Sequence, residues 1–283
     1  MHTLSLLHFV LNVVGLLLWF KWREDMLQSS RRITGGTLLS TLRRAGPPPP
    51  YRWAFFSSLG LLLLLRAVLY WQMGPSLRWS PVIDMGAIVI GFRCDLFPRA
   101  LAFSLGSLVL FIVRFYFWLL LISVLNRKIA DSDVYQNRLR AHLGLLERLH
   151  WTLKLVLPFF ATSLSWLALG PLLARMGLLI PAQSMTHTAQ QAVLLGAAAY
   201  LCWKYLLAVL LVLQIITSHV YFGHAPLWGF IATTGQELLK LFRWLPLRLG
   251  RLDLAPLAGT AIVLLLATKA ERWLPELYRD LPW

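Results

Sequence analysis

The stretch LFRWLPLRLGRLDLAPLAG, residues 241–259, ends directly against the apolar run TAIVLLLA, residues 260–267. It carries three arginines, one aspartate and two prolines. A cationic, proline-containing segment followed at once by leucine, isoleucine and valine is typical of a chain entering a membrane. The same arrangement recurs in the preceding sequence, so this boundary decides the fold that we expect for the whole chain.

The composition also indicates a membrane protein. Of the 283 residues, 58% are hydrophobic and 14% are charged, and the mean hydropathy is +0.65, whereas a soluble domain carries roughly 25% charged residues. Solid leucine runs such as LGLLLLLR favour helices over the weakly alternating strands of a barrel. A bilayer core about 30 Å thick needs about 20 helical residues. The prediction is an all-α polytopic protein with six spans: 3–20, 53–73, 100–125, 155–174, 190–218 and 254–270.

The basic residues predict the orientation of these spans. Loops 21–52, 126–154 and 219–253 together hold 17 Lys and Arg residues, whereas the other loops and the C-terminal tail hold seven. The positive-inside rule therefore places those three loops in the cytoplasm and both termini outside. We expect a protein of the bacterial cytoplasmic (inner) membrane. The net charge of +15 is then explained by basic loops that contact anionic headgroups, and no nucleic-acid partner is expected.

The three basic loops divide the chain into three tandem hairpins of span, basic loop and span. The first membrane hairpin covers 1–73 and the second covers 100–174. The third covers 190–270 and is followed by an external tail at 271–283. The linker 74–99 lies outside the membrane and is amphipathic enough for a surface or re-entrant helix.

Amphipathic segments are expected inside two of the cytoplasmic loops. Leucines from Leu139 to Leu153 recur every three or four residues, and Leu238, Leu241, Phe242 and Leu245 form one face in the third loop. Such a helix either lies in the headgroup plane or packs against the protein's own spans. The sequence leaves both interpretations open.

The opening stretch has a physical interpretation. Its arginines, Arg243, Arg248 and Arg251, are candidates for contact with anionic headgroups or a partner, at about 1 kcal/mol each. Asp253 precedes the last span, where an acid can cap free N–H groups and complement the helix dipole. The same carboxylate could instead pair with one of the neighbouring arginines, or contact a cation or a partner at the headgroup surface as part of a functional site. Pro256 suits the first helical turn.

At these residues the sequence resembles the YggT family of small bacterial and plastid membrane proteins. The similarity lies in 238–259, where Arg243, Leu245 and Pro246 precede a glycine and the segment Leu252–Pro256 (LDLAP). Trp244 replaces the family's usual second arginine, and three hairpins exceed the family's usual one or two. The resemblance implies an integral membrane protein without established enzymatic activity. Family members have been associated with assembly of membrane complexes, with cell-division gene neighbourhoods and with osmotic tolerance.

Three cations lie within the predicted spans: Arg66, Arg114 and Lys204. Ionisable residues at membrane depth are functional candidates by default. All twelve acids lie outside the six blocks, so the sequence predicts no carboxylate partner for these cations within the membrane. They are expected either to snorkel or find internal partners, or else to meet a partner subunit or a ligand.

The sequence shows no catalytic constellation. Nucleophile, metalloprotease and phosphate-loop motifs are absent from it, and we expect no catalytic residues, no metal and no cofactor. Gly170, Gly196 and Gly259 are interpreted as span-packing positions. The expected function is an assembly, scaffold or accessory subunit with a membrane-protein partner or a second copy. The alternatives are a channel or anion transporter that uses Arg114 and Lys204, and a membrane enzyme acting on lipid.

Overall fold

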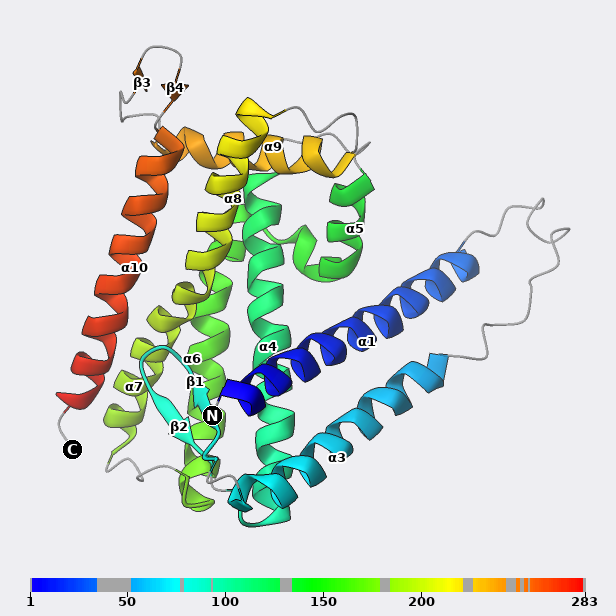
Figure 1. Cartoon of the computed structure of the whole chain (residues 1–283), viewed down its shortest axis with the longest axis vertical. Coiled ribbons are helices and arrows are strands. Elements are labelled where there is room, and N and C mark those ends of the chain that lie inside the picture. Colours follow the sequence, from blue (N-terminus) through cyan, green and yellow to red (C-terminus); the bar gives the residue numbers. More distant parts are fainter. Residues whose placement is uncertain are drawn as a thin grey trace, which may run out of the picture. The chain divides into compact units, whose positions relative to one another are not determined.

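The chain is mostly helical throughout the part that the structure describes (Figure 1). This computed structural model describes residues 2–34, 52–76, 79–92, 94–127, 134–178, 184–220, 226–242, 248–249, 252–253 and 255–281. Five helices are long and apolar enough to cross a membrane: Ser5–Leu27, Trp53–Gly74, Phe97–Leu125, Trp151–Arg175 and Met185–Ser218. The predicted class, an all-α multi-pass membrane protein, is confirmed.

The sixth predicted span, 254–270, falls in helix α10, Ala255–Arg279. Among the described residues this helix is not one of the five candidates, because Lys269, Glu271 and Arg272 lower the hydropathy of its second half. The helix continues past residue 270, so most of the expected external tail, 271–283, is helical as well. The count of six spans stays a prediction.

The described residues fall into two compact units, Met1–Ile83 with Gly91–Val113, and Asp84–Ile90 with Arg114–Trp283. In the first unit, α1 (His2–Thr34) and α3 (Arg52–Ser76) lie side by side. The first cytoplasmic loop was expected from residue 21, but α1 continues to Thr34. Residues 35–51 lie outside the described part.

The linker 74–99 is not the surface or re-entrant helix that we expected. It contains two short paired strands, β1 (Val82–Asp84) and β2 (Val89–Gly91), before α4 begins at Phe97 and runs to Leu125. Asp84 Oδ1 accepts a hydrogen bond from Gly86 N at 2.7 Å, and Gly86 has a φ of +87°. A side-chain turn followed by a left-handed residue reverses the chain, and the β-branched residues on either side favour strands.

Besides Asp84–Ile90, the second unit contains the end of α4 and the chain that follows it. Its elements are α5 (Val134–Leu143), the 3₁₀ turn η1 (Gly144–Arg148) and α6 (Trp151–Arg175). The leucines at 139–153 do not form one continuous helical face, because Gly144 has a φ of +56° and Leu149 is extended. Leu139 and Leu143 are buried, whereas Leu153 is exposed.

Two helix pairs form most of the second unit. The first pair is α6 with α7 (Met185–Ala198), and the second is α8 (Trp203–His219) with α10. The 3₁₀ turn η2 (Ala199–Cys202) joins α7 to α8. The resulting segment, 185–218, has 34 residues and a helical length of roughly 50 Å, which exceeds the bilayer core. A 3₁₀ interruption of this kind often marks a hinge or a strained position.

Helix α9 (Pro226–Leu239) lies crosswise at the end of α8 where α10 begins (Figure 1). Leu238 of α9 packs with Leu210 and Leu211 of α8 in a buried cluster. A Cβ atom on Gly235 would lie 2.8 Å from the Cβ of Gln214, so the two helices touch closely. Of the expected apolar face, Leu238 therefore packs against the protein's own spans, whereas Leu241 is 64% exposed. The choice between the two interpretations stays open for the rest of that face.

Candidate functional site

The structure places Arg66, the first of the three predicted in-span cations, inside the first unit. Its side chain is 0% exposed, so it does not snorkel. Arg66 Nε donates to the Tyr70 hydroxyl at 3.3 Å and Nη2 donates to Ser107 Oγ at 3.0 Å. Nη2 also lies 3.5 Å from His8 Nδ1. These partners are two hydroxyls and an imidazole, so the guanidinium has hydrogen bonds but no carboxylate partner among the described residues.

The other two in-span cations lie in the second unit and contact groups of the same chain. Arg114 Nη2 donates to the backbone carbonyl of Asp84. Lys204 Nζ forms an ion pair with the Glu271 carboxylate and lies 4.4 Å from the ring centroid of Tyr205. The expectation that no in-span cation has a carboxylate partner is therefore wrong for Lys204. Glu271 lies one residue past the predicted span, but α10 continues as a helix beside α8 and brings its carboxylate to the lysine.

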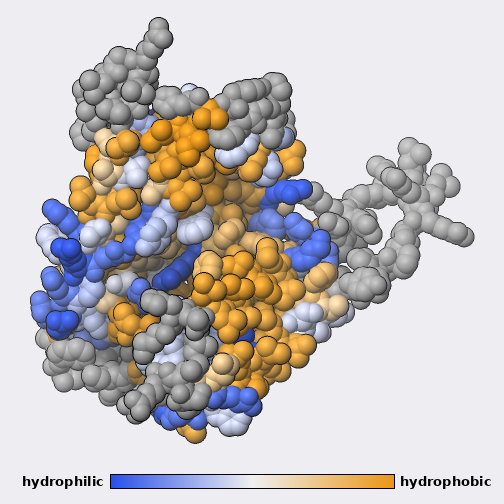
Figure 2. Space-filling model, viewed as in Figure 1, coloured by the Kyte–Doolittle hydropathy of each residue, from blue (hydrophilic) through white to orange (hydrophobic). Residues whose placement is uncertain are grey.

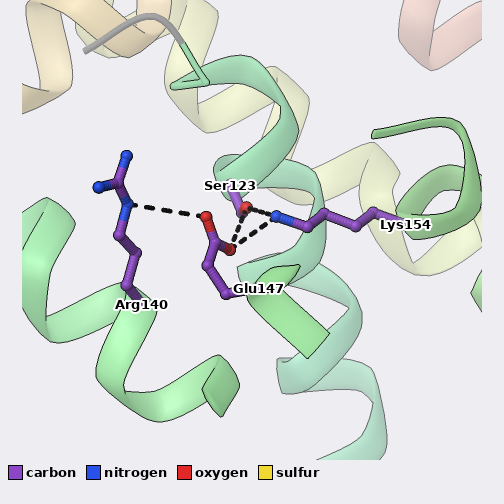
Figure 3. A network of polar contacts seen from close by, with 4 residues as sticks. All are labelled: Ser123, Arg140, Glu147 and Lys154. Carbon is purple, nitrogen blue, oxygen red and sulfur yellow. Dashed lines mark hydrogen bonds and ion pairs between the residues drawn. The ribbon is translucent and has the colours of Figure 1, made fainter. Parts of the chain in front are cut away.

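A second polar cluster, which the sequence did not reveal, surrounds Glu147 (Figure 3). Glu147 Oε2 accepts from Lys154 Nζ at 2.7 Å and from Ser123 Oγ at 2.6 Å, and Lys154 Nζ also lies 2.8 Å from Ser123 Oγ. Arg140 Nε is 3.7 Å from Glu147 Oε1. These four residues, which we call the Glu147 cluster, come from α4, α5, η1 and α6. The cluster therefore ties the loop to the ends of two spans.

Lys154 belongs to the interior of the protein. Only 7% of its side chain is exposed, although the sequence places it among the basic loop residues. In a continuous helix, the spacing of seven residues would put Glu147 and Lys154 on one face. Here the helix is interrupted between them, because η1 ends at Arg148 and α6 begins at Trp151. Only the observed turn at Leu149 and His150 brings the carboxylate to the ammonium. The sequence did not indicate a role for Ser123, since a lone serine in an apolar span is ordinary.

Two tryptophans connect α4 to the 3₁₀ turn between α7 and α8. Trp118 Nε1 donates to the Cys202 carbonyl at 2.7 Å, and Trp203 Nε1 donates to the Phe117 carbonyl at 3.0 Å. The contact is reciprocal, because each helix provides one indole donor and one carbonyl acceptor. Arg114 lies one turn before Trp118 on α4, and Lys204 directly follows Trp203.

The predicted headgroup residues fall mostly outside the described part. Arg243 and Arg251 are not described, and only the backbone of Arg248 and Asp253 is. That backbone forms a small hairpin in which β3 (Arg248–Leu249) pairs antiparallel with β4 (Leu252–Asp253), and Arg248 lies opposite Asp253. Helix α10 begins two residues after Asp253, so the position directly before the helix is residue 254. The roles of all four side chains stay predictions.

The interpretation of the glycines as packing positions is confirmed for Gly196. A Cβ atom there would lie 2.9 Å from the Phe159 carbonyl oxygen and would also meet Ser163 Oγ. Gly170 differs, since its nearest neighbours are atoms of Trp166 in the same helix at 3.5 Å. At Phe159 and Ser163, the close approach of α6 to α7 therefore requires a glycine at position 196.

The described residues contain no group of three or more His, Cys, Asp or Glu side chains that could hold a metal. Cys94 and Cys202 are free thiols. Burial, followed by the charge of Asp95, raises the pKa of Cys94 to about 11, so this thiol is protonated at neutral pH. Cys94 therefore lacks the lowered pKa that a reactive thiolate requires.

These helices and buried charges define a multi-pass helical membrane protein whose in-span cations contact groups of its own chain. No protein-family model matches the sequence, and neither a curated protein nor a solved structure matches it.

Proposed function

We propose that this chain is a non-enzymatic membrane scaffold or accessory subunit that assembles with another membrane protein or with a second copy of itself. One observation carries the proposal. The cations that a transporter would present to a solute, Arg114 and Lys204, contact a backbone carbonyl and a carboxylate of the same chain. Polar side chains in this unit connect helices, as in the Glu147 cluster.

The surface supports the same function. Figure 2 shows broad hydrophobic areas on one face of the molecule. On α10, Leu265 and Leu266 are each more than 60% exposed, and Leu264 is 40% exposed. Such surface is available to lipid and to the helices of a partner, where van der Waals packing drives association. The YggT-like segment at 238–259 agrees with an assembly role.

We also propose the topology in which this function is carried out. The chain lies in the bacterial cytoplasmic membrane with both termini outside, and α10 forms the sixth span beside α8. A helix of 25 residues is roughly 37 Å long, which is enough to cross the bilayer core. The pair of Lys204 and Glu271 reduces the cost of carrying charge in this segment.

The experiment is site-specific photocrosslinking in native membranes, followed by mass spectrometry. A photoreactive amino acid at Leu265 probes the exposed face of α10, and the same group at the buried Leu211 is the matched control. A scaffold gives a discrete protein adduct from position 265 and none from 211. Crosslinking to lipid alone at several exposed positions would contradict the proposal.

A liposome flux assay separates the scaffold from the transporter. The wild-type chain and a double variant, Lys204→Met with Glu271→Leu, are reconstituted and tested with small anions. The double replacement removes both charges together, which avoids leaving one charge unpaired. We expect no flux from either protein. Anion flux that the double variant loses would favour the transporter and reject the scaffold.

A further inference from the structure

The first unit contains a positive charge that its own acids do not balance. Residues 1–83 and 91–113 include only three acids, Glu24, Asp25 and Asp95. Glu24 pairs with Lys21 at 3.9 Å, Asp95 pairs with Arg99 at 3.4 Å, and none of the three forms an ion pair with Arg66. All three lie in the described part, so no undescribed residue of this unit can supply a carboxylate.

Arg66 cannot remove this charge by losing a proton, because a guanidinium stays protonated in proteins. The side chain is fully buried, and a charge in a low-dielectric interior is costly unless it is paired. Its Nη1 atom is buried and has no hydrogen-bond partner among the described residues. The contacts from Nε and Nη2 therefore leave one side of the guanidinium unsatisfied.

The side chains that contact Arg66 are hydroxyls and an imidazole. The Tyr70 hydroxyl accepts from Arg66 Nε at 3.3 Å and lies 2.9 Å from His8 Nδ1. Ser107 Oγ accepts from Nη2 at 3.0 Å and donates its own O–H to the Ser104 carbonyl at 3.1 Å. None of these groups brings a negative charge to the guanidinium.

Asn12 lies beside His8 and is also buried, with 5% of its surface exposed. Its Nδ2 lies 3.0 Å from His8 Nε2, and its Oδ1 has no partner among the described residues. A neutral amide adds no negative charge, so Asn12 does not balance Arg66 either.

We propose that the first unit binds one small inorganic anion, of the halide type, at Nη1 of Arg66. An anion of this size supplies the missing negative charge and accepts a hydrogen bond from Nη1, the guanidinium nitrogen that lacks a partner among the described residues. A larger ligand does not suit a guanidinium that has no exposed surface. The aromatic rings of Tyr70, Trp79 and Phe103 pack against one another beside Arg66, with centroids 5.1–5.9 Å apart. In such apolar surroundings the attraction between the guanidinium and an anion is stronger than in water.

The test measures thermal unfolding of the purified full chain in neutral detergent, with gluconate exchanged for chloride or bromide at constant ionic strength. An anion that binds only the folded state raises the melting temperature with its concentration. We expect a saturable rise for the wild type and none for Arg66→Met. The matched control is Arg99→Met, which removes a partly exposed arginine of the same unit and keeps the halide response. A response that persists in Arg66→Met overturns the proposal.

Two further measurements apply if Arg66→Met does not fold. Equilibrium dialysis of the wild type with radiolabelled chloride should give one bound ion per chain, displaced by bromide; no bound ion overturns the proposal. Addition of anionic or zwitterionic lipid in gluconate tests the headgroup as the source of negative charge. Stabilisation by anionic lipid that abolishes the halide response would assign the site to a lipid phosphate and reject the halide.

Discussion

Trp118 and Trp203 hold each other's helices by a reciprocal pair of hydrogen bonds, from each indole N–H to a backbone carbonyl on the opposite helix. The bonds join α4 to the turn Ala199–Cys202, where the long segment 185–218 changes from α7 to α8. Carbonyls at such an interruption need partners that lipid does not provide. The tryptophan pair therefore ties α4 to the point at which the segment changes from α7 to α8.

The first prediction concerns this pair. Trp118→Phe and Trp203→Phe each keep an aromatic ring and remove one N–H donor, which costs about 0.5–1.5 kcal/mol per hydrogen bond. The melting temperature in detergent should fall for each variant. Because the bonds share one junction, the double variant should lose less than the sum of the two single losses. Additive losses would show that the two bonds act independently.

The second prediction concerns the Glu147 cluster. Glu147→Gln leaves the buried ammonium of Lys154 without a countercharge, and such a change costs about 3–5 kcal/mol. The double variant Glu147→Gln with Lys154→Met should recover most of this loss in a denaturation experiment. Glu237→Gln is the matched control, because the pair of Glu237 with Lys240 joins neighbouring turns and Lys240 is exposed. It should cost at most about 1 kcal/mol.

The third prediction compares two helical glycines. Gly196→Ala places a methyl group 2.9 Å from the Phe159 carbonyl oxygen, so α6 and α7 must move apart and the melting temperature should fall. Gly60→Ala adds a methyl group where nothing lies within 4 Å, and the gain in helix propensity of up to about 1 kcal/mol should leave stability equal or higher. Equal effects at the two positions would contradict the packing role of Gly196.

The fourth prediction tests the orientation. Leu145→Cys and Met185→Cys introduce thiols at positions that are 79% and 88% exposed, in a background with Cys94 and Cys202 replaced by serine. The basic loops predict that a membrane-impermeant reagent added to intact cells labels residue 185 and not residue 145. Labelling of residue 145 from outside would invert the proposed topology.

The sequence predicted the helices better than it predicted the charges. Leucine runs identify spans because any apolar residue of sufficient hydropathy satisfies the bilayer, so five of six blocks became candidate spans. Charged contacts depend on where helices end and how they pack. Glu271 lies one residue beyond a predicted span yet meets Lys204, and Lys154 is buried because the chain turns before it.

The paired strands β1 and β2 could not be predicted from the sequence either. The segment around Asp84 has both apolar and polar residues, which suits a surface helix as well as a hairpin. The choice depends on the turn at Gly86, whose φ of +87° becomes known only from the structure. A close approach of Gly86 to Ala198, where an added Cβ would lie 3.0 Å from the Ala198 Cβ, is a packing effect that no sequence pattern signals.

The last prediction concerns Asp253 and separates two of its interpretations, capping and ion pairing. The backbone register places Asp253 opposite Arg248, and Cβ atoms of directly opposite residues lie about 4.5–5.5 Å apart. The helix begins only at Ala255, so the register favours pairing over direct capping.

Pairing and capping differ in what asparagine does at this position. Asparagine keeps a capping oxygen but loses the charge. If Asp253 pairs with Arg248, Asp253→Asn and Asp253→Ala should lower stability equally, and Arg248→Gln should be coupled to both by about 0.2–1 kcal/mol. The measurement is a double-mutant cycle on thermal stability at low salt, repeated at high salt, where an exposed pair weakens. If Asp253→Asn is harmless while Asp253→Ala costs about 1 kcal/mol, without coupling to Arg248, the carboxylate caps α10 and the ion pair is rejected.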